Sequence, residues 1–197
     1  MRSWPRPAAP TTPVIGCSTR PPGTGYTYSN AGCACLATVV QRAAGQPLPR
    51  FARDHLFDPL GMYQTCFWTG PEPAPPGAAP LASPRPAPLS CGDGGAWSTP
   101  ADLLRWAEAL NTDRLGISEL MQTPGTLDDG TPVDYAWGMG VRTHAGRLVY
   151  RHGGGWPSLR AQLARMPEPG LSLVIVALAD DTERRIPLAD DLLNLLA

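Results

Sequence analysis

Lysine is absent from this sequence of 197 residues, and all 16 residues counted as lysine or arginine are arginine. Arginine keeps its proton under ordinary conditions, whereas a desolvated lysine can lose its own and act as a base. A mechanism that requires a lysine base is therefore excluded for this chain acting alone. Charge is also sparse and balanced, at 17% of residues with a formal net charge of −1. This balance gives no electrostatic reason to expect nucleic acid as a partner.

Long apolar runs are missing as well. No stretch reaches the roughly 18 apolar residues that a membrane span needs, so we expect no transmembrane segment. The first residues lack the apolar centre of a signal peptide, and the sequence leaves the compartment open. Hydrophobic residues make up 43% of the chain, which is typical of a globular protein, and the length predicts one domain.

The cysteines follow no metal-binding or disulfide pattern. Their number is odd, they form no C-x-x-C pair, and the three histidines lie far apart in the sequence. Buried small side chains are the expected role, and we predict no metal and no cofactor. The five cysteines are Cys17, Cys33, Cys35, Cys66 and Cys91.

Proline-rich stretches suggest the organisation of the chain. Residues 1–20 are rich in Pro, Thr and Arg without periodicity, which predicts an irregular tail. Residues 69–90 are dominated by Pro, Ala and Gly, and we interpret them as a surface loop inside a domain that covers 21–197.

Several helices are predicted from apolar periodicity and capping residues. A 3.6-residue pattern after Asn30 places Cys33, Leu36, Val39, Val40 and Ala43 on one face and stops at Gly45. Thr99 has the features of an N-cap, with Pro100 in the first turn and Asp102 completing a capping box. The other expected helices cover 49–57, 117–122 and 186–196, the last presenting Ala189, Leu192, Leu193 and Leu196 on one side.

From Tyr135 onward the pattern changes to strands joined by short turns, which predicts an antiparallel meander. The last strand is almost entirely apolar, so we expect it in the centre of the sheet with both faces covered. The expected strands cover 137–141, 148–152, 159–166 and 171–179.

Three short motifs have the composition of a functional site. A glycine–proline turn, Pro21-Pro22-Gly23-Thr24, leads to Tyr28-Ser29-Asn30 at the start of a helix. The second motif is Gly-Asp-Gly-Gly-Ala-Trp-Ser-Thr at 92–99, and the third is Arg-His-Gly-Gly-Gly at 151–155, at the end of a predicted strand. A Phe-x-Pro-Leu-Gly-Met turn at 57–62 lies between the first and second motifs.

In this order and spacing, the motifs resemble those of the serine β-lactamase-related and DD-peptidase-like hydrolases, in the class C and esterase branch. The resemblance begins near Pro21 and runs to the C-terminus. It implies an α/β fold of the β-lactamase/transpeptidase type, with an antiparallel sheet flanked by helices. The strands and the nucleophile helix that the family places upstream of these motifs are then expected to be missing from this chain.

The resemblance also implies roles for five residues. Tyr28 corresponds to a proton-transfer group and Asn30 to the side chain that holds the substrate amide or orients the base. His152, Gly153 and Gly154 correspond to the opposite, substrate-binding wall, where glycines let a substrate backbone approach the strand. As a purely structural alternative, Asn30 would cap the helix and Tyr28 would pack beside it.

The family's nucleophile signature, Ser-x-x-Lys, does not occur in the sequence. A free tyrosine titrates near about 10, so Tyr28 needs a neighbouring cation to act as a base near neutrality. Replacement nucleophiles are conceivable but poorly supported. Ser18 is followed by a proline where the signature has lysine, and its segment is too proline-rich for a buried helix. Ser29 is the variable middle residue of its motif, and Cys33 and Cys35 lie on a helix expected to face the core. These candidates are Ser18, Ser29, Cys17, Cys33 and Cys35.

Three functional hypotheses follow. The chain is a truncated serine hydrolase of the family, acting on amide, β-lactam or ester carbonyls and inactive by itself. Alternatively, it is a non-catalytic binding pseudoenzyme whose cleft still accepts a small molecule or peptide with a carbonyl or carboxylate group. The third hypothesis is a half-protein completed by a partner that supplies the N-terminal part, and an exposed sheet edge also predicts self-association.

Overall fold

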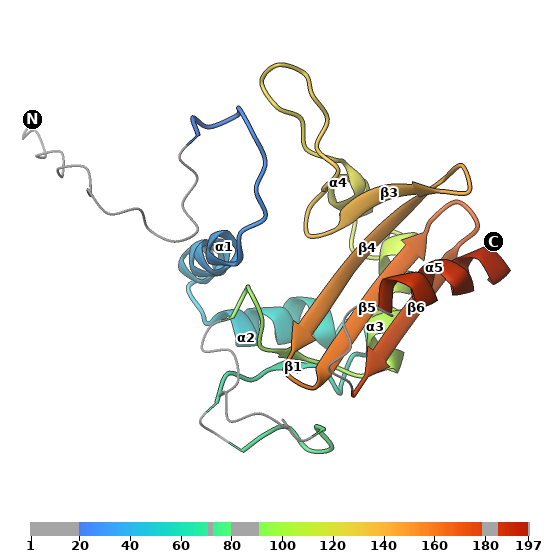
Figure 1. Cartoon of the computed structure of the whole chain (residues 1–197). Helices are drawn as coiled ribbons and strands as arrows, with labels where there is room; N and C mark the ends of the chain where they lie inside the picture. The colour runs from blue at the N-terminus through green and yellow to red at the C-terminus, as the bar shows by residue number, and fades with distance from the viewer. Residues whose placement is uncertain (1–19, 71–72, 80–90, 179–184, 197) are drawn as a thin grey trace, which may run out of the picture.

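The computed structural model describes residues 20–70, 73–79, 91–178 and 185–196. The predicted tail therefore lies outside the described residues except for Arg20, as do Cys17, Ser18 and most of the proline-rich loop. The described part contains a four-stranded antiparallel sheet with helices on both faces, which confirms the predicted fold class (Figure 1). Among these residues, no helix is both long and apolar enough to span a bilayer.

The sheet is a simple meander in the order β3-β4-β5-β6. Its strands are β3 (Gly140–His144), β4 (Arg147–Trp156), β5 (Leu159–Met166) and β6 (Leu171–Ala177). Ala145 and Gly146 join β3 to β4 with positive φ angles of 48° and 80°, as a two-residue hairpin turn requires.

The β3 strand begins three residues later than predicted. The segment before it folds back on itself, because Ala136 donates its N–H to the carbonyl of Met139 at 2.8 Å and Gly138 has a φ of 88°. Trp137 therefore lies in a turn and is exposed.

The β4 strand is longer than predicted, and the three glycines lie inside it instead of following it. Pairing with β5 continues through Gly153↔Gln162 and Gly154↔Ala161 to Trp156↔Leu159. The β3–β4 ladder, in contrast, ends at Gly140↔Arg151. Glycine-rich sequence suggested a strand end, but the ladder with β5 keeps these residues extended.

The prediction of a central last strand is wrong, because β6 is the final strand of the described sheet. Both of its faces are nevertheless covered. Helix α3 (Pro100–Asn111) contacts β6 on one face, and α5 (Arg185–Leu196) contacts it on the other (Figure 1). The apolar run therefore reflects two covered faces and not two neighbouring strands. Ala179, its predicted end, lies outside the described residues.

Helix α5 uses part of its predicted apolar face. Ala189 and Leu193 are buried, and Leu193 packs against Val149, Ala164 and Met166 of the sheet. Leu196 is exposed at the end of the helix, contrary to the prediction.

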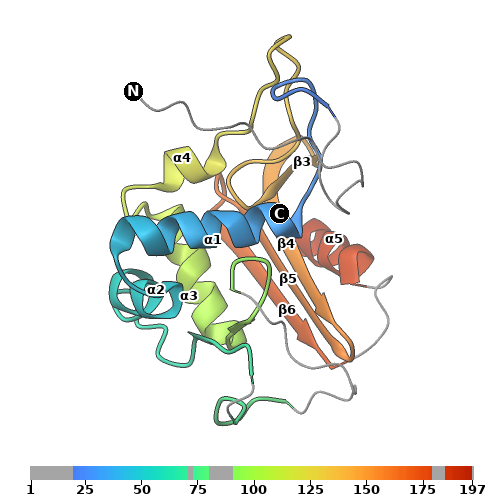
Figure 2. The same ribbon diagram turned by 90° about the vertical axis from the view of Figure 1, so that its left-hand side faces the viewer.

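Helix α1 (Asn30–Ala44) begins and ends as predicted, and Gly45 closes it with a φ of 65°. Its packing differs from the prediction. Ala37 is its one buried residue, whereas Leu36 and Val39 are 63% and 60% exposed. Much of the apolar stripe expected to face the core is therefore exposed, although Cys33 and Val40 of that stripe are half-buried. Figure 2 shows α1 crossing in front of the sheet, next to α2 (Leu48–Ala52).

The helix predicted over 49–57 is formed by α2 and a following π-helical turn, η1 (Arg53–Phe57). The Phe-x-Pro-Leu-Gly-Met turn then provides much of a core. Phe57, Leu60 and Met62 are buried, and they cluster with Ala109 of α3. The predicted landmark turn thus joins the helical part of the molecule to α3. The remaining elements are β1 (Cys66–Phe67), β2 (Ala96–Trp97) and α4 (Ser118–Gln122).

Thr99 caps α3 as predicted, accepting the N–H of Asp102 at 3.2 Å. The second half of the predicted capping box does not form. The Asp102 carboxylate, 1% exposed, instead accepts bonds from the N–H of Gln64 at 2.9 Å and the hydroxyl of Thr65 at 2.8 Å. This buried carboxylate therefore ties the segment before β1 to the start of α3.

Candidate functional site

The first motif positions Tyr28 between a tight turn and α1. Gly23 has a φ of 79°, and Thr24 donates its backbone N–H to the carbonyl of Pro21 at 3.3 Å, so Pro22 and Gly23 occupy the centre of a type II turn. The Thr24 hydroxyl donates to the same carbonyl at 2.8 Å. Ser29 is the N-cap of α1, accepting the N–H of Gly32 at 3.1 Å. The structural alternative that placed the cap at Asn30 is therefore wrong, since Asn30 is the first helical residue.

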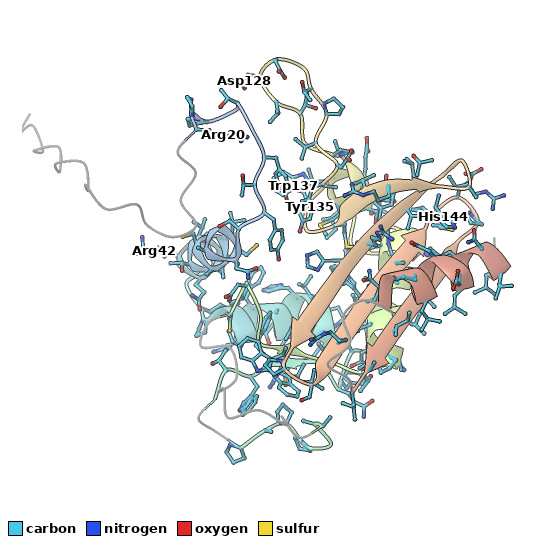
Figure 3. All side chains as sticks on the ribbon, in the orientation of Figure 1. Arg20, Arg42, Asp128, Tyr135, Trp137 and His144 are labelled. Atoms are coloured by element: carbon cyan, nitrogen blue, oxygen red, sulfur yellow. The ribbon has the colours of Figure 1, made fainter. Side chains whose placement is uncertain are left out.

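A second loop holds this segment in place. Asp128 donates its N–H to the carbonyl of Gly23 at 3.0 Å, so the loop before β3 touches the tight turn. Figure 3 shows Asp128 beside the segment that begins at Arg20, with Tyr135 and Trp137 lower on the same side of the molecule. The two loops together form one wall of a cleft next to β4.

The cleft is a cavity of about 460 Å³ whose centre is a cluster of aromatic rings. The ring centroid of Tyr28 lies 6.0 Å from that of His152, which projects from β4. Tyr135 lies between the walls, with ring centroids 6.0 Å from Tyr28 and 6.3 Å from His152. Tyr26 stacks on Tyr135 at 5.3 Å. The cavity is lined by Tyr26, Tyr28, Asp134, Tyr135, Gly140, Arg142, Arg151, His152, Gly153 and Gln162.

The structure thus brings together three of the five residues predicted from the sequence, Tyr28, His152 and Gly153. Asn30 is exposed at the start of α1 and is not part of the cavity lining. Gly154 is also outside the lining, and a Cβ at this position would meet Ala161 at an ordinary 3.9 Å. Packing within the described chain therefore does not require glycine at position 154.

Burial controls the protonation of the tyrosines. Desolvation raises the pKa of Tyr28 above its usual 10, and the negative charges that Cys33 and Asp93 can carry raise this pKa further. Desolvation, followed by the neighbouring Tyr26 and Tyr28, raises the pKa of Tyr135 to about 12. The Tyr28 hydroxyl is therefore protonated at neutral pH and can donate a hydrogen bond or a proton.

The arginines in the lining already have carboxylate partners. Arg142 lies 3.1 Å from Asp134, in a pair whose side chains are both largely exposed. Arg151 lies 2.9 Å from Asp190 of α5. The lining arginines are thus engaged by carboxylates, and the chain has no lysine to stabilise a Tyr28 phenolate.

Sequence reasoning missed Tyr26, Tyr135 and Gln162. The Gln162 amide is 3% exposed and donates to the carbonyl of His152 at 3.2 Å, across the pair Gly153↔Gln162. The predicted strand also contains Arg160 and Arg165, so a polar residue at 162 gave no distinct sequence signal. Tyr135 gave no signal, because its role depends on the turn before β3. In the described residues, no three His, Cys, Asp or Glu side chains gather as they would around a metal.

Cys33 lies on the inner side of α1, near enough to influence Tyr26, Tyr28 and Tyr135 electrostatically, but it is not part of the cavity lining. Cys35 is exposed, and Ser29 is committed to capping α1. The geometry therefore does not favour any of these residues as a replacement nucleophile.

Known proteins are similar to this chain in sequence. The D-aminopeptidase of Gluconobacter oxydans (strain 621H) is 27% identical over 157 residues, which is 73% of this chain and 30% of that protein. The D-alanyl-D-alanine-carboxypeptidase/endopeptidase AmpH of Escherichia coli (strain K12) is 32% identical over 112 residues, 52% of this chain and 28% of that protein. The matched part is thus less than a third of each of these curated relatives.

The fold has a close counterpart among solved structures. The crystal structure of a penicillin binding protein from Bacillus halodurans superimposes with a TM-score of 0.74 at 22% sequence identity, covering 91% of this chain and 60% of that one. A family model described as Beta-lactamase matches residues 17–197. The chain therefore belongs to the β-lactamase family, the serine β-lactamase- and DD-peptidase-like hydrolases.

Proposed function

We propose that Tyr28 and His152 lie on two walls of an acyl-transfer site for an amide, β-lactam or ester carbonyl. One observation carries the proposal. Tyr28 and His152 come from motifs that lie far apart in the sequence, yet their ring centroids lie 6.0 Å apart across a cavity of about 460 Å³. A cavity of this size fits a dipeptide or a small bicyclic ligand.

The roles in this site follow from the chemistry of each side chain. Tyr28 is neutral at physiological pH, so it serves as a proton donor toward the leaving group. His152 binds a substrate carboxylate or the Tyr28 hydroxyl, and Gly153 lets the substrate backbone approach β4. Asn30 holds the substrate amide if its side chain turns toward the cleft when ligand binds.

D-configured residues are the substrate class to test first. The two curated relatives are named as a D-aminopeptidase and a D-alanyl-D-alanine-carboxypeptidase/endopeptidase. A short peptide with a C-terminal D-alanine offers both the amide carbonyl and the carboxylate that the proposed roles require.

Acyl transfer needs a nucleophile whose proton a base removes, and the family uses Ser-x-x-Lys for both tasks. The 197 residues contain no lysine and no such signature. We therefore propose that these residues by themselves bind substrate reversibly and do not become acylated. A partner or further segment that supplies a serine and a lysine would complete the reaction.

A binding function without catalysis is the second candidate. It is favoured by the raised pKa of Tyr28 and by the carboxylates that already engage Arg142 and Arg151. Both candidates predict that the chain binds ligand. They differ in the effect of a partner or segment that supplies a serine and a lysine: the acyl-transfer candidate predicts that hydrolysis is restored, and the binding candidate predicts that it is not.

The test is a titration of the 197-residue chain with N-acetyl-D-alanyl-D-alanine, followed by NMR. We expect reversible shifts of the His152 imidazole and of the tyrosine rings, together with binding about tenfold weaker in His152→Ala. His55→Ala is the matched control, since His55 is exposed and its ring contacts Phe51 outside the cleft. Equal ligand affinity of the two variants would contradict the proposed binding site at His152.

Covalent chemistry is tested separately with a fluorescent penicillin and intact-protein mass spectrometry. We expect no adduct on the isolated chain. A stoichiometric serine adduct would contradict binding without acylation, while leaving the location of the cleft intact.

A further inference from the structure

A second, smaller cavity lies on the other side of the β3–β4 hairpin from the aromatic cluster. Its volume is about 130 Å³, and it is lined by Arg142, Thr143 and His144 of β3, Val149 and Arg151 of β4, and Asp190 of α5. Figure 3 labels His144 at the end of β3, beside α5. None of the three motifs includes Arg142, Thr143 or His144, so the proposed function leaves this cavity unexplained.

Strand alternation explains why the basic side chains converge. Arg142 and His144 are two residues apart on β3 and therefore project from the same face of the sheet. The register pairs Arg142↔Val149 and Gly140↔Arg151, which places Arg151 on that face as well. This is the face that α5 covers, since Arg151 contacts Asp190 at 2.9 Å and His144 Nε2 lies 2.8 Å from Asn194 Oδ1.

The cavity lining has more hydrogen-bond donors than acceptors. Each guanidinium has five N–H donors, and the bonds described for Arg142 and Arg151 all use Nη1. Nε and Nη2 of both arginines are the remaining donors for a ligand. The lining carries two permanent positive charges, from Arg142 and Arg151, against one carboxylate, Asp190.

The carboxylate partner of Arg142 can be displaced. The Arg142–Asp134 pair has side chains that are 51% and 79% exposed, and such surface pairs contribute about 0–1 kcal/mol. An anion held by both arginines at once would form several charge-assisted bonds, which are stronger than one exposed pair.

We propose that this cavity is a binding site for a small oxyanion of the size of phosphate, held by Arg142 and Arg151. The same two arginines also line the aromatic cleft, so they are shared by the two cavities. An anion in the small cavity draws both guanidiniums toward α5 and lowers the positive potential of the cleft. The site would thus modulate anionic ligands in the cleft, although its own occupancy does not depend on the function proposed for the cleft.

The test is a titration of the 197-residue chain with sodium phosphate, followed by ¹H–¹⁵N NMR, at an ionic strength held constant with sodium chloride. We expect saturable shifts confined to 142–144, Arg151 and the Asp190–Asn194 turn of α5. Arg142→Gln should weaken phosphate binding about tenfold by removing charge-assisted bonds. Asp190→Asn should strengthen it, because the competing acceptor on Arg151 loses its charge.

Arg50→Gln is the matched control, because Arg50 forms an exposed pair with Asp54 on α2 and η1, away from both cavities. Its phosphate affinity should equal that of the unmodified chain. Equal weakening by Arg50→Gln and Arg142→Gln would show general charge screening and overturn the site. Shifts that never saturate, or that sodium acetate and sodium chloride reproduce in full, would overturn it as well. Melting curves of each variant establish that the fold is kept.

Discussion

At the scale of single residues, Tyr135 connects the two walls of the cleft. Its ring contacts Tyr26 and Tyr28 on one wall and His152 on the other. Its backbone is fixed by the turn before β3 and by an isolated bridge to Gly140. Tyr28 is itself 47% exposed, so it depends on few contacts for its orientation. We infer that Tyr135 orients Tyr28 toward His152.

The raised pKa of Tyr135 predicts an alkaline loss of stability. The unfolded phenol deprotonates near about 10, whereas the folded one does so at about 12. The folded state therefore holds the proton more tightly than the unfolded state does. The resulting contribution to the free energy of unfolding is fully present below pH 10 and is lost as the pH rises through 12. Tyr135→Phe should flatten the fall in melting temperature between pH 10 and 12, measured by circular dichroism.

Tyr63→Phe is the control for this prediction, because Tyr63 is 79% exposed and has no described ring partner. It should leave the alkaline fall unchanged. If both variants follow the unmodified curve, the Tyr135 phenol does not have the predicted pKa.

Residue-level prediction from the sequence worked where a motif fixed a backbone position. Tyr28 and His152 were predicted from their motifs, and the structure places their rings around one cavity. Whether they act in catalysis stays a prediction. Tyr135 and Gln162 were missed because their contacts are made by a turn and a strand register, which join residues distant in sequence.

At the scale of elements, the placement of α1 depends on the glycine loop that precedes β2. Gly92 has a φ of 106°, and a Cβ there would lie 2.7 Å from both the Cys33 carbonyl oxygen and the Ala37 Cβ. This contact is too close for any side chain. Because Tyr28 directly precedes α1, the loop also helps to set the width of the cleft.

Gly92→Ala should destabilise the fold by about 3 kcal/mol, since it combines an unfavourable backbone conformation with overpacking against a helix. Gly45→Ala is the matched control. Gly45 also has a positive φ, of 65°, but nothing lies within 4 Å of its Cβ position, so a loss of about 1 kcal/mol is expected. Urea denaturation measures both, and equal losses would show that α1 does not pack closely on this loop.

Element-level prediction succeeded where local rules dominate. The strand Leu159–Met166 has its predicted bounds, and α1 ends at its predicted glycine. It failed where contacts with other elements determine the structure. Pairing with β5 extends β4 through its glycines. Two covering helices make the edge strand β6 as apolar as a central strand. No local pattern encodes these contacts.

At the scale of the whole molecule, several surfaces expose apolar side chains of the kind usually buried in a protein core. Leu36 and Val39 are exposed on α1, Val176 is exposed on β6, and Leu195 is 80% exposed on α5. The chain also corresponds to 60% of the Bacillus halodurans structure, so the remainder of that protein has no counterpart in the described fold. Exposed apolar side chains next to an edge strand favour association with another polypeptide.

We therefore expect the isolated chain to self-associate through the edge of β6. In sedimentation equilibrium, its average mass should exceed the 20.9 kDa of one chain and should rise with concentration. A charge on the edge strand opposes strand pairing, so Val176→Lys should weaken association about tenfold. Leu120→Lys changes an equally exposed apolar residue on α4 and should leave association unchanged, because α4 is not part of the sheet edge. A monomer at every concentration would show that the described surfaces are compatible with a solitary chain, and equal weakening by both variants would place the contact elsewhere.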